Sequence, residues 1–148
     1  MTDTSRAAAE RPYRLEEQVG FLLRVANQRH AAIFQAMAPD GLTRTQYAAL
    51  VQLAERGDCS QNELGRRTAM DVATIKGVVD RLKAKGMVRA TPDPADRRRT
   101  VLSIAPAYRA EMSRLFADGH AITEATLAPL SEAEAATLVA LLRRIAGP

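Results

Sequence analysis

Three consecutive arginines, Arg97, Arg98 and Arg99, stand in the stretch DPADRRRTVLSI at residues 93–104. Adjacent like charges repel one another, so such a run either faces water as a solvated turn or meets an anion outside the protein. An arginine side chain fits the narrow minor groove of A·T-rich DNA, where the negative potential is enhanced. We therefore expect Arg98 to enter a minor groove and Arg97 or Arg99 to contact phosphate. Asp96 is placed to pair with an arginine and hold the turn in shape.

The positive charge of the chain is concentrated around these arginines. The whole chain of 148 residues has a net charge of +4 and an isoelectric point of about 9.7. Between residues 60 and 100, ten Lys and Arg side chains against five Asp and Glu leave +5, so the remainder is close to neutral. A local basic surface fits the phosphate backbone of double-stranded DNA, which releases counterions when it is neutralised.

A helix just before the arginines is suited to the major groove. Asp71 is a plausible N-cap for VATIKGVVDRLKAKG, and Gly86 ends this helix. Its inward face is predicted to consist of Ile75, Val78, Val79 and Leu82, and its outward face of Ala73, Thr74, Lys76, Gly77 and Asp80. Small and hydroxylated residues near the start of a helix let it enter the groove. Thr74 is expected to meet a base or phosphate, Lys76 to read guanine or neutralise phosphate, and Arg81 to touch the DNA backbone.

The helix after Asp71 is expected to be the recognition helix, and two further helices are predicted before it. Ser60 with Glu63 has capping-box spacing and opens a short helix ending near Thr68; Ser60 and Gln61 at its start are further candidates for DNA contact. Thr43 with Gln46 has the same spacing and opens a helix through Ala54, with an inward face of Tyr47, Leu50, Val51 and Ala54. The segments MVRAT at 87–91 and TVLSI at 100–104 read as a hairpin, with the arginines at its tip and on its returning strand.

Longer helices flank this central part. Apolar residues spaced by three and four predict a helix over residues 15–38, ended by Pro39, Asp40 and Gly41. Residues 106–127 form a second, starting at Pro106, and Ser131 with Glu134 caps a third that carries Leu138, Leu141, Leu142 and Ile145. The fold class is therefore mainly α, a winged helix-turn-helix with flanking N- and C-terminal helices forming a dimerisation region. We divide the chain into an N-terminal arm with a long dimerisation helix (residues 1–41), a DNA-binding lobe (residues 42–104) and C-terminal dimerisation helices (residues 105–148).

Several function classes lack support in the sequence. No Cys and His cluster has zinc spacing, no Gly-rich loop cradles phosphate, and no residues are ordered as a catalytic triad, so we expect neither an enzyme nor a metal or other cofactor. No stretch approaches the ~18–20 apolar residues of a membrane span. The start, MTDTSRAAAERPYR, lacks the apolar core of a signal peptide and reads as a floppy arm. A soluble, cytoplasmic protein without a membrane partner is expected.

The central residues resemble the MarR family of transcriptional regulators. The resemblance rests on LTRTQYAALVQLAERG, on SQNELGRRTAMDVATIKGVVDRLKAKGMV and on the D-x-R pattern in DPADRRRTVLSI, and it is strong over residues 42–104. It implies a homodimer of triangular outline with interleaved terminal helices. It also implies a roughly palindromic operator, recognition helices in successive major grooves, and repression.

Within that family, LEEQVGFLLRVANQRHAAIF and CSQNELGRRTAMDVATIKGVVDRL look similar to a branch that controls degradation of aromatic carboxylates, such as nicotinate-pathway repressors. This implies a small aromatic acid bound between the dimer helices and the DNA-binding lobe. A carboxylate needs a cation or hydrogen-bond donors, and a ring needs an apolar wall. The candidate ligand residues are Arg24, His30, Phe34 and Tyr47. Each of three has an alternative role without a ligand: Arg24 in a surface ion pair, His30 as a solvated helix residue and Tyr47 as part of the core.

Two other functions compete with this reading. Cys59, the only cysteine, lies just before a helix N-cap, and a helix N-terminus lowers a thiol's pKa, so a redox-responsive regulator of the same fold is one alternative. The other is an architectural DNA-binding protein without an effector. The first would respond to peroxide through Cys59, and the second would bind any duplex of equal length with similar affinity.

Overall fold

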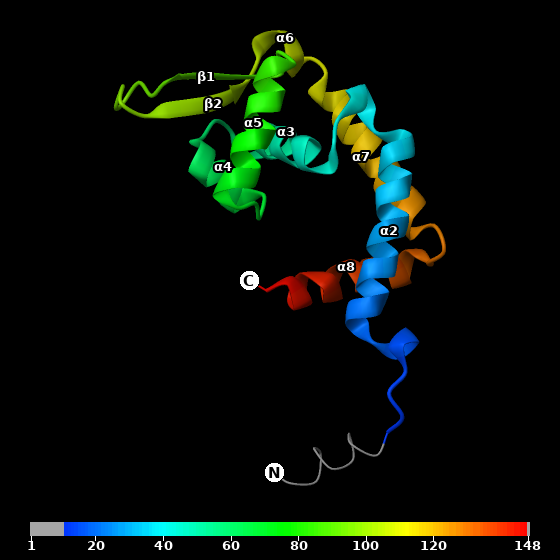
Figure 1. Cartoon of the computed structure of the whole chain (residues 1–148). Coiled ribbons are helices and arrows are strands. Elements are labelled where there is room, and N and C mark those ends of the chain that lie inside the picture. Colours follow the sequence, from blue (N-terminus) through cyan, green and yellow to red (C-terminus); the bar gives the residue numbers. More distant parts are fainter. Residues whose placement is uncertain (1–10, 148) are drawn as a thin grey trace.

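The structure is a computed structural model that describes residues 11–147 (Figure 1). The predicted N-terminal arm lies mostly outside these residues. The flanking helices are α2 (Val19–Met37), the short α6 (Pro106–Arg109), α7 (Met112–Leu127) and α8 (Glu132–Ala146), with 3₁₀ turns η1 (Leu15–Glu17) and η2 (Pro39–Gly41) on either side of α2. The central part, which we call the lobe, contains α3 (Arg44–Arg56), α4 (Gln61–Arg67), α5 (Val72–Ala84) and the strands β1 (Val88–Pro92) and β2 (Thr100–Ile104).

Local capping determines where the helices of the lobe begin. Thr43 and Gln46 form the predicted reciprocal capping box of α3, and the Asp71 carboxylate accepts a hydrogen bond from the Thr74 amide at the start of α5. Ser60 caps α4 as predicted, but the box is not reciprocal. The Glu63 carboxylate binds the guanidinium groups of Arg66 and Arg67 instead of the Ser60 amide, because two cations one turn further along compete for it.

The buried core lies inside the lobe. The predicted inner face of α5 is confirmed, since Ile75, Val78, Val79 and Leu82 are all buried. On α3 the prediction is only partly right: Leu50 is buried, whereas Tyr47, Val51 and Ala54 are half-buried. The buried positions of α3 are Gln46, Ala49, Leu50 and Leu53, a face turned by about one residue from the predicted one.

The wing is a two-stranded antiparallel hairpin. Its register runs from Val88 opposite Ile104 to Pro92 opposite Thr100. The strand β2 begins at Thr100, so all three arginines precede it, although the Arg99 carbonyl still accepts a hydrogen bond from the Asp93 amide at 2.9 Å. The prediction that the arginines lie at the hairpin tip is confirmed, but only the backbone of Arg99 continues the pairing of the returning strand. Asp96 folds the tip into a turn that keeps Arg97 and Arg98 out of the ladder.

Two predictions about the flanking helices also need correction. The first helix begins at Val19 and not at residue 15, because Gln18 adopts an extended conformation between η1 and α2. The predicted helix over 106–127 is two helices, α6 and α7, separated at residues 110–111. The capping box of Ser131 and Glu134 at the start of α8 is confirmed.

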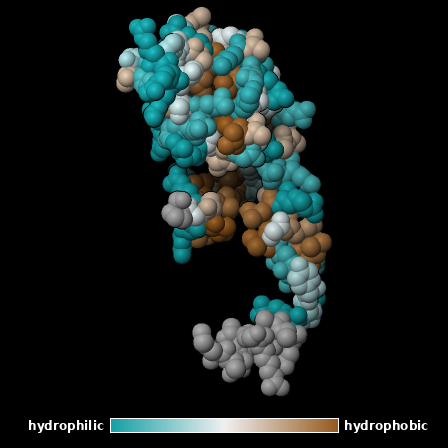
Figure 2. Space-filling view, turned by 60° about the vertical axis from the view of Figure 1, so that its left-hand side comes forward, coloured by the Kyte–Doolittle hydropathy of each residue, from teal (hydrophilic) through white to brown (hydrophobic). Residues whose placement is uncertain are grey.

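The flanking helices leave apolar side chains uncovered. Within the described chain, α8 contains no buried residue, and Leu138, Leu141, Leu142 and Ile145 are all exposed. The first half of α2 also exposes Val19, Leu22 and Leu23. Figure 2 shows apolar surface gathered where α8 and α2 lie, below the lobe.

No single helix within residues 11–147 is long and apolar enough to span a membrane. The helices α7 and α8 reach that length and composition only as a pair, which is bent by 103° at the break between them.

Candidate functional site

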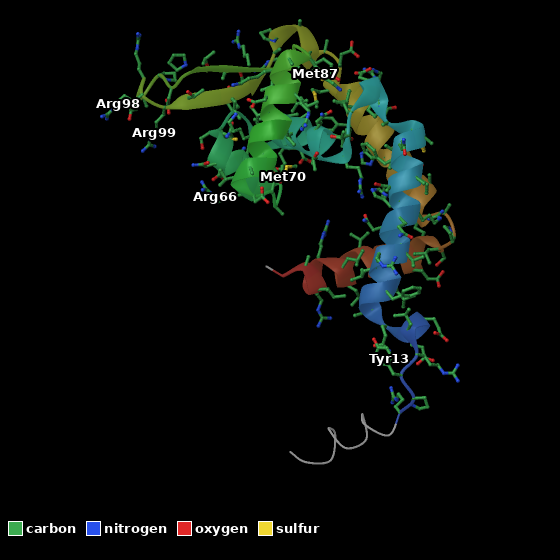
Figure 3. All side chains as sticks on the ribbon, in the orientation of Figure 1. Tyr13, Arg66, Met70, Met87, Arg98 and Arg99 are labelled. Atoms are coloured by element: carbon green, nitrogen blue, oxygen red, sulfur yellow. The ribbon has the colours of Figure 1, made fainter. Side chains whose placement is uncertain are left out.

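The wing tip presents its arginines away from the protein. Asp96 holds the turn as predicted: its Oδ1 atom accepts hydrogen bonds from the amide of Arg98 at 3.1 Å and from Nε of Arg98 at 3.2 Å. Arg99 Nε lies 3.9 Å from the other carboxylate oxygen. The Arg98 side chain is nevertheless 92% exposed, and Figure 3 shows Arg98 and Arg99 at the far end of the hairpin. Arg97 is exposed as well.

The predicted recognition helix, α5, exposes the face that was expected to meet DNA. Ala73, Thr74 and Lys76 are exposed and Gly77 is half-buried. The ammonium group of Lys76 is already bonded to the Asp80 carboxylate at 2.8 Å, and this bond raises the pKa of Lys76 and lowers that of Asp80. Any anion that Lys76 contacts would therefore have to compete with Asp80 for this lysine.

Four further residues complete the candidate DNA-facing surface. Arg81 folds back over α5, with a guanidinium nitrogen 3.3 Å from where a Cβ at Gly77 would lie. Ser60 is exposed and Gln61 half-buried, and the Ser60 hydroxyl is used in capping α4. Sequence reasoning missed Val72, whose side chain is 72% exposed at the first position of α5. Figure 1 places α4, α5 and the wing on the side of the molecule away from α2 and α7.

A separate cavity of about 210 Å³ lies where α2, α3 and α7 meet. It brings together three of the four predicted ligand residues, His30, Phe34 and Tyr47. The structure does not bring Arg24 into it: this side chain is exposed on α2, with its guanidinium carbon 5.4 Å from the centre of the Phe21 ring. The remaining wall consists of Arg44 from α3 and of Gly119, Ile122 and Thr123 from α7.

Arg44 supplies the cation that sequence reasoning assigned to Arg24. Its guanidinium donates to the Asn27 side-chain oxygen at 2.8 Å, so a residue of α2 holds it at the cavity. The only local signal was its position, next to the capping Thr43 and three residues before Tyr47. Nothing in the sequence indicates that Asn27, 17 residues away, would fix it.

His30 is a neutral polar group in the same wall. Its Nδ1 shares a hydrogen bond of 2.9 Å with the Thr126 hydroxyl of α7. Burial, and secondarily the positive charge of Arg44, lower the pKa of His30 from its ordinary value of 6.5. The imidazole is therefore uncharged near neutral pH, and Arg44 carries the positive charge of the cavity.

Tyr47 joins all three helices of the cavity. Its hydroxyl donates to the Leu115 carbonyl of α7 at 2.6 Å, and its ring packs edge-on against Phe34 of α2, with centroids 5.8 Å apart. Burial raises the pKa of Tyr47, so the hydroxyl keeps its proton at neutral pH. Tyr47 therefore packs against the core, which was the alternative role expected for it, and it also lines the cavity.

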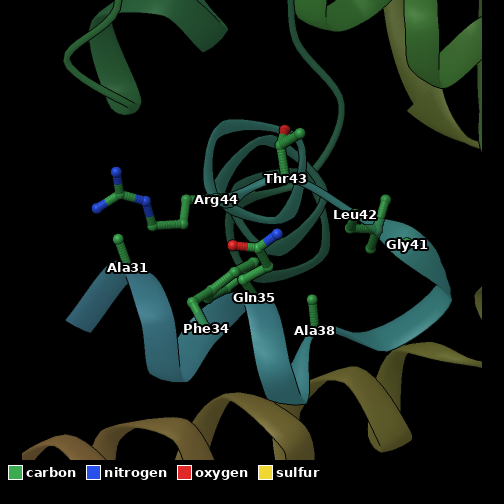
Figure 4. A pocket seen from close by; sticks show the side chains of 8 residues that line it. All are labelled: Ala31, Phe34, Gln35, Ala38, Gly41, Leu42, Thr43 and Arg44. Atoms are coloured by element: carbon green, nitrogen blue, oxygen red, sulfur yellow. The ribbon is translucent and has the colours of Figure 1, made fainter. Parts of the chain in front are cut away.

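A second hollow, of about 460 Å³, also has Phe34 and Arg44 in its lining (Figure 4). The end of α2, the η2 turn and the start of α3 surround it, and Gln35 and Thr43 add polar groups. Phe34 and Arg44 therefore belong to the walls of both spaces.

Cys59 is poorly suited to redox sensing. Its side chain is buried, and its backbone pairs with that of Leu102. Burial raises the pKa of the thiol, the reverse of the expected effect of a helix N-terminus, so little thiolate is present at neutral pH. Within residues 11–147, no three His, Cys, Asp or Glu side chains are grouped as a metal site requires.

Known proteins resemble this chain over most of its length. Residues 40–99 match the model of the MarR family. The HTH-type transcriptional repressor NicR of Pseudomonas putida is 40% identical over 145 residues, which span 97% of this chain and 92% of NicR. A probable transcriptional regulator from Pseudomonas aeruginosa is 53% identical, with a TM-score of 0.85, over 89% of this chain and 99% of that one. Bordetella bronchiseptica BpsR, whose DNA binding is regulated by 6-hydroxynicotinic acid, is 41% identical, with a TM-score of 0.86, over 93% of this chain and 99% of that one.

Proposed function

Because this chain belongs to the MarR family of transcriptional regulators, we propose that it is a homodimeric repressor released from a roughly palindromic operator by a small aromatic carboxylate of the nicotinate type. The observation that carries this proposal is the cavity between α2, α3 and α7, where a cation and two aromatic rings surround a space of about 210 Å³. The relatives of this chain are transcriptional regulators and not enzymes.

The chemistry of the cavity fits a one-ring acid. Arg44 is the partner for the carboxylate, and a planar guanidinium binds a carboxylate through two parallel hydrogen bonds. Phe34 and Ile122 supply apolar wall for the ring, and His30 supplies a nitrogen for a ring substituent. NicR by its name is a repressor, and the DNA binding of BpsR is regulated by 6-hydroxynicotinic acid, which has these groups.

The position of the cavity supports release of DNA. Arg44 and Tyr47 lie on α3, which packs against α4 and α5, whereas His30 and Thr123 lie on the flanking helices. A ligand held between the two parts changes the angle between them, and in a dimer that angle sets the spacing of the two recognition helices. We propose that α5 enters the major groove and that Arg98 enters the minor groove. Such a DNA-binding regulator acts in the cytoplasm.

The test is fluorescence anisotropy of a labelled duplex from the region upstream of the gene, at fixed salt, with random DNA as the control. We expect specific binding that 6-hydroxynicotinic acid, or a related nicotinate or benzoate, reverses. Equal affinity for random DNA would instead indicate an architectural protein. Specific binding released by peroxide and by no acid would return the effector role to Cys59.

A pair of variants tests the cavity itself. Arg44→Gln is expected to weaken acid binding by about tenfold or more, since it removes the charged partner, while operator binding persists. Arg24→Gln removes the same charge from an exposed position of α2 and is expected to leave acid binding unchanged. If only Arg24→Gln weakened acid binding, Arg24 would be the residue that binds the carboxylate. Its side chain would then have to reach the cavity of a partner protomer.

A further inference from the structure

The hydroxyl proton of Tyr47 is committed to one acceptor. It is donated to the Leu115 carbonyl at 2.6 Å, and this bond connects α3 of the lobe to α7 of the flanking region. By the geometry of an α-helix, the same carbonyl also accepts the amide of Gly119, four residues further along. Leu115 would therefore keep a hydrogen-bond partner if Tyr47 left, whereas Tyr47 needs a new acceptor because its hydroxyl is partly buried.

Gly119 makes this contact possible. A Cβ atom at position 119 would lie 2.0 Å from the Tyr47 hydroxyl oxygen and 3.0 Å from the ring carbon that bears it. The first distance is far below van der Waals contact, so any side chain at position 119 would displace the Tyr47 hydroxyl from α7. The glycine lies in the middle of α7, where it is less favourable for helix stability than alanine. The close approach of Tyr47 is the structural reason for a glycine there.

The same two residues form part of the cavity wall. Tyr47 and Gly119 line the space of about 210 Å³ together with Arg44 and His30. An anion bound to Arg44 is therefore enclosed with the Tyr47 hydroxyl. A hydrogen bond to a carboxylate is roughly twice as strong as one to a neutral carbonyl, so the anion is the better acceptor.

We propose that Tyr47 is a positioning residue that couples the cavity to the lobe: a bound carboxylate takes the hydrogen bond of the Tyr47 hydroxyl from the Leu115 carbonyl and so detaches α3 from α7. No proton is transferred; one hydrogen bond replaces another. This inference rests on the proposed function, because it needs an aromatic acid in the cavity. It adds that the charge of the acid, and not only its size, drives release of DNA.

The variant Tyr47→Phe tests the coupling because it keeps the ring against Phe34 and removes only the hydroxyl. Without acid, its operator affinity is expected to fall towards that of the acid-saturated wild type. Saturating 6-hydroxynicotinic acid should then lower its operator affinity by less than about twofold, against about fivefold or more for the wild type. Calorimetry should still detect acid binding through Arg44, within about tenfold of the wild type, since the variant loses only the difference between the Tyr47 bond to the carboxylate and its bond to Leu115.

Two further measurements separate coupling from simple loss of stability. Gly119→Ala should reproduce the weak response to acid by displacing Tyr47, whereas Gly20→Ala, with open space around its added Cβ on α2, should behave as the wild type. The amide 6-hydroxynicotinamide, a neutral analogue, should bind the wild type without releasing DNA.

The outcomes distinguish this inference from the proposed function. If Tyr47→Phe keeps the wild-type ratio of operator affinities with and without acid, the inference is wrong and the proposed function stands. Release of DNA by the amide at full occupancy would also overturn it. If no acid releases the wild-type protein, the proposed function and the inference are both wrong.

Discussion

The lobe and the flanking helices differ in how much of their apolar surface is buried within one chain. The lobe encloses a core in which Leu50, Leu64 and Leu82 are fully buried, and each of its helices has a buried face. By contrast, α8 buries nothing within the described chain, and the first half of α2 exposes a row of apolar side chains. One chain therefore contains the interior of the lobe, whereas the flanking helices present a surface whose apolar area a second copy would cover.

The strongest way to break this comparison is to place a charge on the apolar face of α8. Leu141→Glu is expected to yield a folded monomer whose operator affinity falls by about 100-fold or more, since two linked half-sites no longer act together. Analytical ultracentrifugation measures the oligomeric state, and fluorescence anisotropy measures the operator affinity. Ala140→Glu introduces the same charge on the opposite side of α8 and should leave the dimer intact. A dimeric Leu141→Glu protein would show that another surface joins the protomers.

The core of the lobe offers the complementary test. Leu50→Ala removes a side chain that is 0% exposed and is expected to cost 2–5 kcal/mol of unfolding free energy, about the range seen for buried leucines. Leu142→Ala, made in the monomeric Leu141→Glu background, should cost less than about 1 kcal/mol because its position is already exposed there. Urea denaturation measures both. Equal losses would mean that α8 packs on its own chain in solution.

A third prediction compares two arginines of equal charge in the two regions. Arg98→Ala should weaken operator binding by about 1–3 kcal/mol without unfolding the protein, because the exposed wing tip is where DNA is proposed to lie. Arg143→Ala removes the same charge from α8 and should change affinity little. Anisotropy at several salt concentrations gives both values, and unchanged affinity of Arg98→Ala would remove the wing from the interface.

The smallest expected effect is a pH dependence at the cavity. Burial and Arg44 keep the pKa of His30 below 6.5, so the free protein holds this imidazole neutral. A bound carboxylate favours the protonated form, so acid binding should tighten as the pH falls from 8 to 6, by less than the tenfold per pH unit allowed for one proton. For folding the sign is opposite: below pH 6.5 the unfolded chain takes up the proton first, and stability is lost.

Calorimetry in two buffers of different ionisation enthalpy measures the proton uptake. His30→Gln should abolish it while keeping a polar group near Thr126. Uptake that persists in His30→Gln would place the titrating group elsewhere.

The lobe was predictable because its signals are local. A capping residue and its partner stand three positions apart, as in Thr43 with Gln46, and the buried face of α5 repeats at three and four residues. The cavity has no such signature. Tyr47 meets Leu115 across 68 positions and His30 meets Thr126 across 96, so the sequence indicated suitable residue types without the pairings. Arg44 was missed for the same reason, since Asn27 fixes it from another helix.

The ion pair between Lys76 and Asp80 on α5 bears on how the protein would search a genome. A recognition helix whose lysine is already neutralised by its own aspartate has a weaker attraction to arbitrary phosphates, and attraction of that kind dominates contact with wrong sequences. Early encounters would then depend on the arginines of the wing, with α5 engaging fully only where base contacts compensate for opening the pair. Such a protein spends less time on each incorrect site and gives up some affinity at the correct one.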